Sequence, residues 1–134
     1  MIDIGCGNGQ RTILFSKYSK KTLGIDYSEK MVYEAKKYLK TQSTAIQKNI
    51  EFFNYDCCDL EKMNEVMKNV NVVYHCAATA HEGLSVFSPY EISKNNFLAS
   101  VSVFTSAIAN KVKRIIFCSS MARYGDQKTP FTED

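Results

Sequence analysis

Three glycines close to the start of the chain have the spacing of a ligand-binding turn. The run "DIGCGNG" places Gly5, Gly7 and Gly9 directly after a stretch typical of a β-strand and before a helical segment. Glycine has no Cβ, so the backbone of such a turn can come close to a bound ligand. We therefore predict that this turn binds a nucleotide-type cofactor through its backbone.

Residues beside the turn favour one class of cofactor. The dinucleotide fingerprint has a third glycine at position 10, where this chain has Gln10. A carboxylate at Asp3 is unfavourable beside a pyrophosphate but favourable beside the positively charged end of S-adenosylmethionine. Residues 1–48 therefore resemble class I S-adenosylmethionine-dependent methyltransferases. The resemblance is strongest up to about residue 40. The resemblance implies that Asp26, in "TLGIDYSEK", binds both ribose hydroxyls of that cofactor; a helix cap at Asp26 is the alternative.

A second set of motifs begins at about residue 49. The run "YDCCDLEKMNEVMKNVNVVYHCAA" is followed in order by "KNNFLASVSVFTSAI", "VKRIIFCSSMARYGD" and "PFTED". On these motifs residues 49–134 resemble the NAD-dependent epimerase/dehydratase family, extended short-chain dehydrogenases/reductases that act on nucleotide sugars. The resemblance implies NAD as cofactor, a nucleotide sugar as substrate, and a structural role for Asn96. It also implies cofactor contacts from Asp56, Cys57, His75, Ala77 and Ala78.

The same resemblance implies one catalytic residue in this chain. Ser120 stands in the place of the family's catalytic serine or threonine, where it would hydrogen-bond the reacting sugar hydroxyl. The alternative is a serine that satisfies backbone groups at the end of a strand. In this family a tyrosine, with its pKa lowered by a nearby lysine, removes the hydroxyl proton. Tyr90 and Lys94 have this Tyr-x-x-x-Lys spacing but precede Ser120, whereas the family's pair follows it. We therefore expect a truncated fragment without the catalytic pair, and expect Tyr124 to be a packing or substrate-wall residue.

Alternation of β-branched or aromatic runs with helical segments predicts an α/β fold. Right-handed crossovers favour a three-layer, Rossmann-like, doubly wound parallel sheet of order 3-2-1-4-5, incomplete at both ends. The ligand crevice is then expected between the first and fourth strands. We expect a single domain over residues 1–134, with a methyltransferase-like part and an epimerase-like part joined in the polar stretch 40–49. The five expected strands are Met1–Ile4, Thr22–Asp26, Ile50–Asp56, Val70–Ala77 and Arg114–Ser120, the last two buried on both faces.

Helical spacing predicts three helices with one apolar stripe each. Ser28 is expected to cap the first, and the longest is expected from about Ile92 to Asn110. The three stripes are Met31, Ala35, Tyr38 and Leu39; Met63, Val66, Met67 and Val70; and Phe97, Val101, Phe104 and Ile108.

Composition excludes several classes of function. The chain of 134 residues is 45% hydrophobic without an apolar run of about 20 residues, so no membrane span is expected. It opens without a secretion signal, which predicts a cytoplasmic protein. The net charge of +3 comes from scattered lysines, which does not indicate nucleic-acid binding. Five cysteines without a C-x-x-C pair predict free thiols, and His75, Cys76 and His81 lack a fourth ligand, so no metal is expected.

Three hypotheses of function follow. The first is an NAD-dependent nucleotide-sugar epimerase/dehydratase, or a remnant of one. The second is an S-adenosylmethionine-dependent methyltransferase. The third is a non-catalytic fragment that binds an adenosine-containing ligand.

Overall fold

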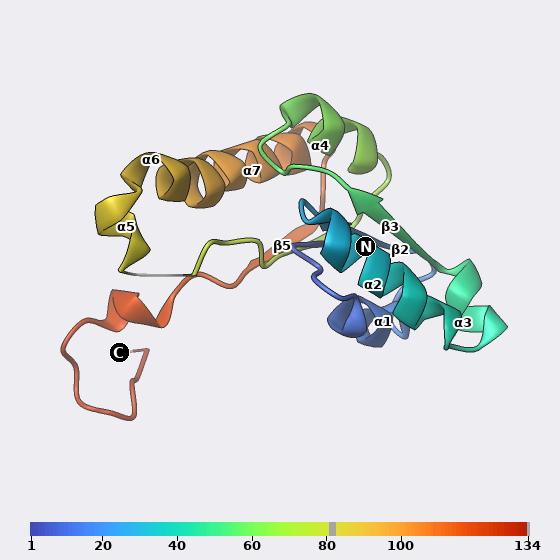
Figure 1. The fold of residues 1–134 in the computed structure, drawn as a ribbon, viewed down its shortest axis with the longest axis horizontal. Helices are drawn as coiled ribbons and strands as arrows, with labels where there is room; N and C mark the ends of the chain where they lie inside the picture. Colours follow the sequence, from blue (N-terminus) through green and yellow to red (C-terminus); the bar gives the residue numbers. More distant parts are fainter. Residues whose placement is uncertain (81–82, 134) are drawn as a thin grey trace.

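A computed structural model describes residues 1–80 and 83–133, which form a five-stranded parallel sheet with helices on both faces (Figure 1). The strand order is β3-β2-β1-β4-β5 and every neighbouring pair is parallel. The predicted doubly wound, Rossmann-like sheet of order 3-2-1-4-5 is therefore confirmed, with β1 and β4 side by side. The strands are β1 (Ile2–Ile4), β2 (Thr22–Asp26), β3 (Ile50–Asn54), β4 (Val72–His75) and β5 (Arg114–Phe117).

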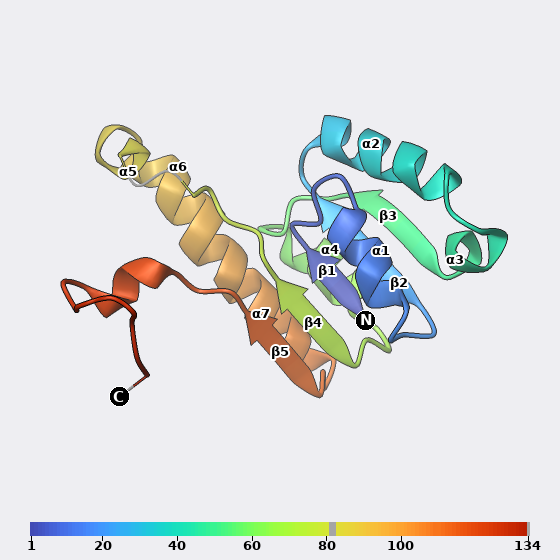
Figure 2. The same cartoon turned by 90° about the horizontal axis from the view of Figure 1, so that it is seen from below.

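Helices cover the two faces of the sheet, and Figure 2 shows α1 on one side and α4 and α7 on the other. α5, α6 and a π-helical segment lead into α7 and extend beyond the carboxyl ends of the strands (Figure 2). The helices are α1 (Gln10–Ser16), α2 (Glu29–Lys40), α3 (Thr44–Lys48), α4 (Leu60–Val66), α5 (Leu84–Phe87), α6 (Pro89–Ile92), the π-helix η1 (Ser93–Leu98), α7 (Ala99–Ala109) and the 3-10 helix η2 (Met121–Tyr124).

Two apolar cores hold these layers together. The larger core packs the strands against α4 and α7. The smaller lies between the sheet and α1 and α2, where Phe15 of α1 also stacks on Tyr74 of β4 with ring centroids 4.1 Å apart. The larger core comprises Ile2, Ile4, Ile25, Met63, Met67, Val70, Val73, Val103 and Ala107, and the smaller Cys6, Ile13, Val32, Ala35, Ile50 and Phe52.

The first two helix predictions hold in part. The Ser28 side chain caps α2 by accepting from the Met31 N–H at 3.4 Å, as predicted. The predicted stripe of α2 is confirmed at Ala35, which is buried, and at Leu39, which packs against the smaller core. It is wrong at Met31, where the neighbouring Val32 is buried instead, and at Tyr38, which is exposed. For the next helix, the predicted stripe is confirmed at its buried members Met63, Met67 and Val70.

The predicted core face of the long helix is confirmed only at Phe104, which packs against the larger core. Phe97 and Ile108 are 72% and 75% exposed, while the face in contact with the sheet carries Ala99, Val103 and Ala107. A π-helix has a wider turn than an α-helix, so η1 rotates the residues before Ala99 relative to those after it. This rotation accounts for the exposed Phe97, whereas within α7 the sheet packs mainly against small residues and leaves Val101 and Ile108 exposed.

The predicted bounds of β2 are confirmed, and the other four predicted strands run one to three residues too far at one end or both. The predicted burial of β5 on both faces is wrong. β5 pairs only with β4 in the described part of the chain, and its Arg114 and Phe117 are exposed. Over the same residues, no helix combines the length and apolarity needed to cross a bilayer.

Candidate cofactor-binding site

The glycine turn joins β1 to α1 at the carboxyl edge of the sheet. Gly5, Gly7 and Gly9 all have positive φ, between 55° and 81°. A Cβ on Gly5 would meet the Cα of Ala77 at 2.6 Å, and a Cβ on Gly9 would meet the Phe52 ring at 2.6 Å. A Cβ on Gly7 would meet no described atom within 4 Å. Close packing thus requires glycine at positions 5 and 9, whereas the backbone at Gly7 faces open space.

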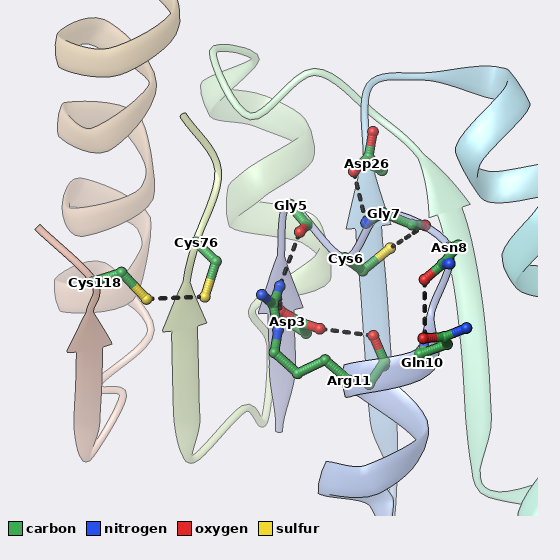
Figure 3. A network of polar contacts seen from close by, with 11 residues as sticks. Asp3, Gly5, Cys6, Gly7, Asn8, Gln10, Arg11, Asp26, Cys76 and Cys118 are labelled. Atoms are coloured by element: carbon green, nitrogen blue, oxygen red, sulfur yellow. Dashed lines mark hydrogen bonds and ion pairs between the residues drawn. The ribbon is translucent and has the colours of Figure 1, made fainter. Parts of the chain in front are cut away.

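Asp26 connects the end of β2 to this turn. Its Oδ2 accepts the Gly7 N–H at 2.8 Å (Figure 3), and its Oδ1 accepts the Ser28 N–H at 2.9 Å. Because Ser28 is the N-cap of α2, the alternative in which Asp26 serves only as that cap is wrong. The carboxylate is half-buried and also lines a cavity.

The first cavity, of about 360 Å³, lies at the carboxyl ends of β1 to β4. It brings together six of the residues predicted to bind the cofactor. These are Gly5, Asp26, Asp56, Cys57, Ala77 and Ala78. Three further lining residues, Tyr27, Tyr55 and Thr79, were not predicted from the sequence. Tyr27 and Tyr55 directly follow the ends of β2 and β3, and a position just after a strand end could have indicated them.

A second cavity, of about 1120 Å³, lies beside the first at the ends of β4 and β5. His75 and Ser120 line this cavity rather than the first, and the segment Cys76–Ala80 lines both. The Ser120 Oγ accepts the Ala122 N–H at 3.1 Å. Ser120 therefore satisfies a backbone group at the start of η2 and also borders a space large enough for a small molecule.

A partly buried chain of hydrogen bonds fixes the wall between the two cavities. The Ser100 hydroxyl donates its proton to the Asn96 carbonyl at 2.6 Å. In the 2.9 Å contact between Ser100 and His75, the hydroxyl must therefore accept, and His75 Nε2 carries the proton. The Asn96 side chain accepts the Thr79 N–H at 2.7 Å and donates to the Thr79 carbonyl at 3.2 Å. His75 is 1% exposed, and burial lowers the pKa of its imidazole. His75 thus supports the wall as a neutral side chain, and Asn96 holds Thr79 in place.

Asp3 is not available to a ligand. It is fully buried in β1, where its Oδ1 accepts from Arg11 at 2.8 Å and its Oδ2 accepts from the Thr12 hydroxyl at 2.7 Å (Figure 3). Arg11 also donates to the Gly5 carbonyl at 2.9 Å. The expectation that Asp3 faces a positively charged cofactor end is therefore wrong, because this carboxylate is neutralised inside the protein and stabilises the turn.

The segment after β3 supplies the far wall of the first cavity. Asp56 Oδ1 accepts the Cys58 N–H at 2.9 Å. Burial, together with the neighbouring Cys58 and Asp56, raises the pKa of the Cys57 thiol to about 11. Cys57 is therefore a neutral wall residue near pH 7 rather than a nucleophile.

Neither Tyr90 nor Tyr124, each of which has a lysine four residues later, is arranged as a base. Tyr90 is 76% exposed and lines neither cavity. Tyr124 and Lys128, a pair that sequence reasoning overlooked, share no helix because η2 ends at Tyr124. The Tyr124 hydroxyl donates to Glu133, which raises the pKa of the phenol, and its ring stacks on Phe131 with centroids 4.9 Å apart. A general base requires the opposite shift in pKa, and these contacts fit the packing role predicted for Tyr124.

Within residues 1–80 and 83–133, no three side chains of the metal-ligating types come together. His81, considered above with His75 and Cys76, lies outside the described residues.

Comparison with protein families identifies the chain. The model of the NAD dependent epimerase/dehydratase family matches residues 25–134. The chain belongs to this family. Among curated epimerases, a UDP-glucose 4-epimerase of Rickettsia akari is 27% identical over 122 residues, and one of Dictyostelium discoideum is 29% identical over 99 residues. The first match covers 90% of this chain and 36% of the relative, the second 72% and 29%. The chain thus spans about a third of the length of these epimerases.

Solved structures of the same family have the same fold. A UDP-N-acetylglucosamine 4-epimerase from Methanobrevibacter ruminantium, in complex with UDP-N-acetylmuramic acid, is 25% identical with a TM-score of 0.75, covering 98% of this chain and 42% of that one. A UDP-glucose 4-epimerase from Bifidobacterium longum, in complex with NAD+ and UDP, is 23% identical with a TM-score of 0.80, covering 99% and 41%.

The comparisons do not support the methyltransferase resemblance. The epimerase/dehydratase family model begins at residue 25 and includes Asp26, so residues 25–48 lie within the family match and not in a separate part. The expected join at 40–49 therefore has no support.

Proposed function

We propose that this chain binds NAD, with the adenosine part in the first cavity, as the cofactor-binding portion of a nucleotide-sugar epimerase or dehydratase. The observation that carries the proposal is the placement of Asp26. An ionised carboxylate has about four acceptor positions, and Gly7 and Ser28 use one on each oxygen. The remaining positions suit two hydroxyl donors on neighbouring carbons, as in an adenosine ribose. Membership of the family and the NAD+ bound to the Bifidobacterium longum epimerase support the same cofactor.

The residues around Asp26 fit the rest of such a cofactor. The open space at Gly7 allows the backbone to approach a ligand closely. Asp56 and Cys57 stand at the end of β3, where they would border the adenine. Ala77 and Ala78 are small side chains in the wall shared by the two cavities, so the cofactor could extend from the first into the second.

The second cavity would receive the nicotinamide end and the sugar nucleotide. Bound NAD would supply the hydride acceptor for oxidation of a sugar hydroxyl. Ser120 would hydrogen-bond and orient that hydroxyl, and His75 and Asn96 would keep the cavity wall in place. We assign proton removal to neither Tyr90 nor Tyr124, because the first lines neither cavity and the second is hydrogen-bonded to Glu133.

Isothermal titration with NAD tests the cofactor assignment. We expect saturable binding of NAD and none of S-adenosylmethionine at the same concentration. Asp26→Asn removes a charged acceptor worth about 1.5–3 kcal/mol, so it should weaken NAD binding at least tenfold. Asp59→Asn is the matched control, because Asp59 caps α4 and does not line the first cavity. An absence of NAD binding at millimolar concentration, or equal loss in both variants, would contradict the proposal.

A second candidate function is binding of the cofactor without turnover. The arrangement of Tyr124 favours it, since the pKa of this phenol is raised and not lowered. Incubation of the 134-residue chain with NAD and UDP-glucose, followed by chromatography of the sugar nucleotides, distinguishes the two. Formation of a new sugar nucleotide would exclude binding without turnover.

A further inference from the structure

Two free cysteines face each other at the carboxyl ends of β4 and β5. The Sγ atoms of Cys76 and Cys118 are 3.2 Å apart (Figure 3). The ladder between the two strands pairs His75 with Phe117, so the next residue on each strand stands directly opposite the other. The Cys118 N–H donates to the His75 carbonyl at 3.3 Å, which extends this register to the cysteines.

We propose that Cys76 and Cys118 form a reversible intramolecular disulfide when the protein meets a hydroperoxide. A disulfide bond is about 2.05 Å long, so the sulfur atoms need to approach by only about 1.2 Å. Neighbouring strands lie about 4.8 Å apart, within the range of about 4.4–6.8 Å between the Cα atoms of a bridged pair. The bond therefore requires no rearrangement of the sheet.

Two of the other cysteines contact backbone oxygens rather than thiols. The Cys58 Sγ lies 3.5 Å from the Lys94 carbonyl, and the Cys6 Sγ lies 3.7 Å from the Gly7 carbonyl. The Cys6 side chain is also buried, which shields its sulfur from a hydroperoxide in solution. The geometry therefore selects Cys76 and Cys118 among the five cysteines.

Exposure sets the order of the two steps. Cys118 is exposed and can meet a peroxide first, whereas Cys76 is half-buried and its pKa is raised, mainly by burial, to about 12. The Cys118 thiolate attacks one peroxide oxygen, the O–O bond breaks, and hydroxide leaves to give a sulfenic acid. The Cys76 sulfur then attacks the Cys118 sulfur, the S–O bond breaks, and the Cys76 proton leaves with the hydroxyl as water. With hydrogen peroxide, two thiols and one peroxide give one disulfide and two water molecules.

The bond would lie in a wall that both cavities use. Cys76 lines the two cavities and Cys118 lines the second. Ser119 and Ser120 follow Cys118 directly, so the disulfide would fix the segment that carries Ser120 to the end of β4. This inference rests on the positions of two thiols and does not depend on which cofactor the cavities bind.

Peptide mapping tests the disulfide directly, because trypsin separates the candidate cysteines. Cleavage after lysine and arginine gives peptides 69–94 with Cys76, 115–123 with Cys118, 49–62 with Cys57 and Cys58, and 1–11 with Cys6. The reduced protein is treated with a slight excess of hydrogen peroxide, its remaining thiols are blocked with N-ethylmaleimide, and the digest is analysed by mass spectrometry. We expect peptides 69–94 and 115–123 to be joined within one monomeric chain, and dithiothreitol to separate them.

Two variants make the result decisive. Cys118→Ser should abolish the linked peptides, whereas Cys58→Ser, which also changes a thiol beside the first cavity, should leave their yield within about twofold of the wild type. Circular dichroism of each variant confirms that it is folded before oxidation. The proposal is overturned if the peroxide-treated chain links peptide 49–62 as readily, or if Cys118 is oxidised to a sulfinic acid while Cys76 remains free.

Discussion

Gly5 lies so close to Ala77 that a Cβ on Gly5 would meet the Ala77 backbone at 2.6 Å. The contact joins the turn after β1 to the segment after β4, across the pair of central strands where the sheet reverses its order. The first cavity lies at this place, and both residues line it. The glycine turn is therefore part of the packing of the sheet as well as part of the proposed cofactor site.

Replacement of this glycine should destabilise the chain. Gly5→Ala adds a methyl group against backbone atoms that cannot rotate away, at a φ of 81°. We expect the free energy of unfolding in urea to fall by about 2–4 kcal/mol. Gly83→Ala is the control, because a Cβ there meets no described atom within 4 Å and φ is −62°; it should change the value by less than about 0.5 kcal/mol. Equal effects of the two substitutions would show that the contact with Ala77 does not matter.

The buried ion pair under the turn should contribute more than the pairs on the surface. Asp3 is fully buried and the Arg11 side chain is 41% exposed, so Arg11→Met leaves a buried carboxylate without its positive partner. We expect a loss of about 2–3 kcal/mol in the free energy of unfolding, less than for a fully buried pair because water reaches the arginine site. Asp3→Asn in the Arg11→Met background should recover part of this loss, since an amide carries no charge.

The control for this prediction is the surface pair of Lys21 and Glu51. Its side chains are 63% and 51% exposed, and Lys21→Met should lower the free energy of unfolding by less than about 1 kcal/mol. A loss in Arg11→Met no larger than the loss in Lys21→Met would contradict the structural role of the pair.

The arrangement of the strands follows from the sequence because it depends on local patterns and on handedness. Short β-branched runs alternate with helical segments, and right-handed crossovers then determine the order of five parallel strands. Residues that follow strand ends, such as Asp26 and Ala77, come together at one edge for the same reason. Most of the cofactor contacts implied by the family resemblance consequently line a single cavity.

Other features depend on contacts that no local pattern reveals. The long helix packs small residues such as Ala99 and Ala107 against the sheet, whereas its larger apolar residues Phe97 and Ile108 are exposed. The role of Asp3 was misjudged because its partner Arg11 lies on the next helix, where only the folded turn brings the two together. The register that sets Cys76 opposite Cys118 likewise exists only once β4 and β5 are paired.

Burial of His75 should make stability depend on pH. Burial lowers the pKa of the folded imidazole below its usual value of about 6.5. Below that pH the unfolded chain therefore binds a proton that the folded chain does not, and the free energy of unfolding falls with decreasing pH until the folded pKa is reached. The slope contributed by one such group is at most about 1.4 kcal/mol per pH unit.

Urea unfolding between pH 7.5 and 5 measures this slope. We expect His75→Gln to lower stability at pH 7.5 but to flatten its dependence on pH, because the glutamine does not titrate. The second histidine of the chain, His81, is present in both proteins, so its titration does not account for a difference. An unchanged slope in the variant would mean that His75 does not titrate differently in the folded and unfolded chains.

Oxidation of Cys76 and Cys118 should stabilise the folded chain. The two residues are 42 positions apart, and a bridge across a loop of this length lowers the entropy of the unfolded chain by an amount equivalent to roughly 4 kcal/mol, less any strain in the folded state. A net gain of about 2–4 kcal/mol would raise the midpoint of thermal unfolding by roughly 5–15 °C in a domain of this size. Calorimetry of the peroxide-treated protein with and without dithiothreitol measures the change, and Cys118→Ser should show no difference between the two conditions. The opposite result is an unchanged or lower unfolding midpoint in a chain that peptide mapping shows to carry the disulfide. It would mean that the bond distorts the ends of β4 and β5, and that the folded geometry does not favour the disulfide.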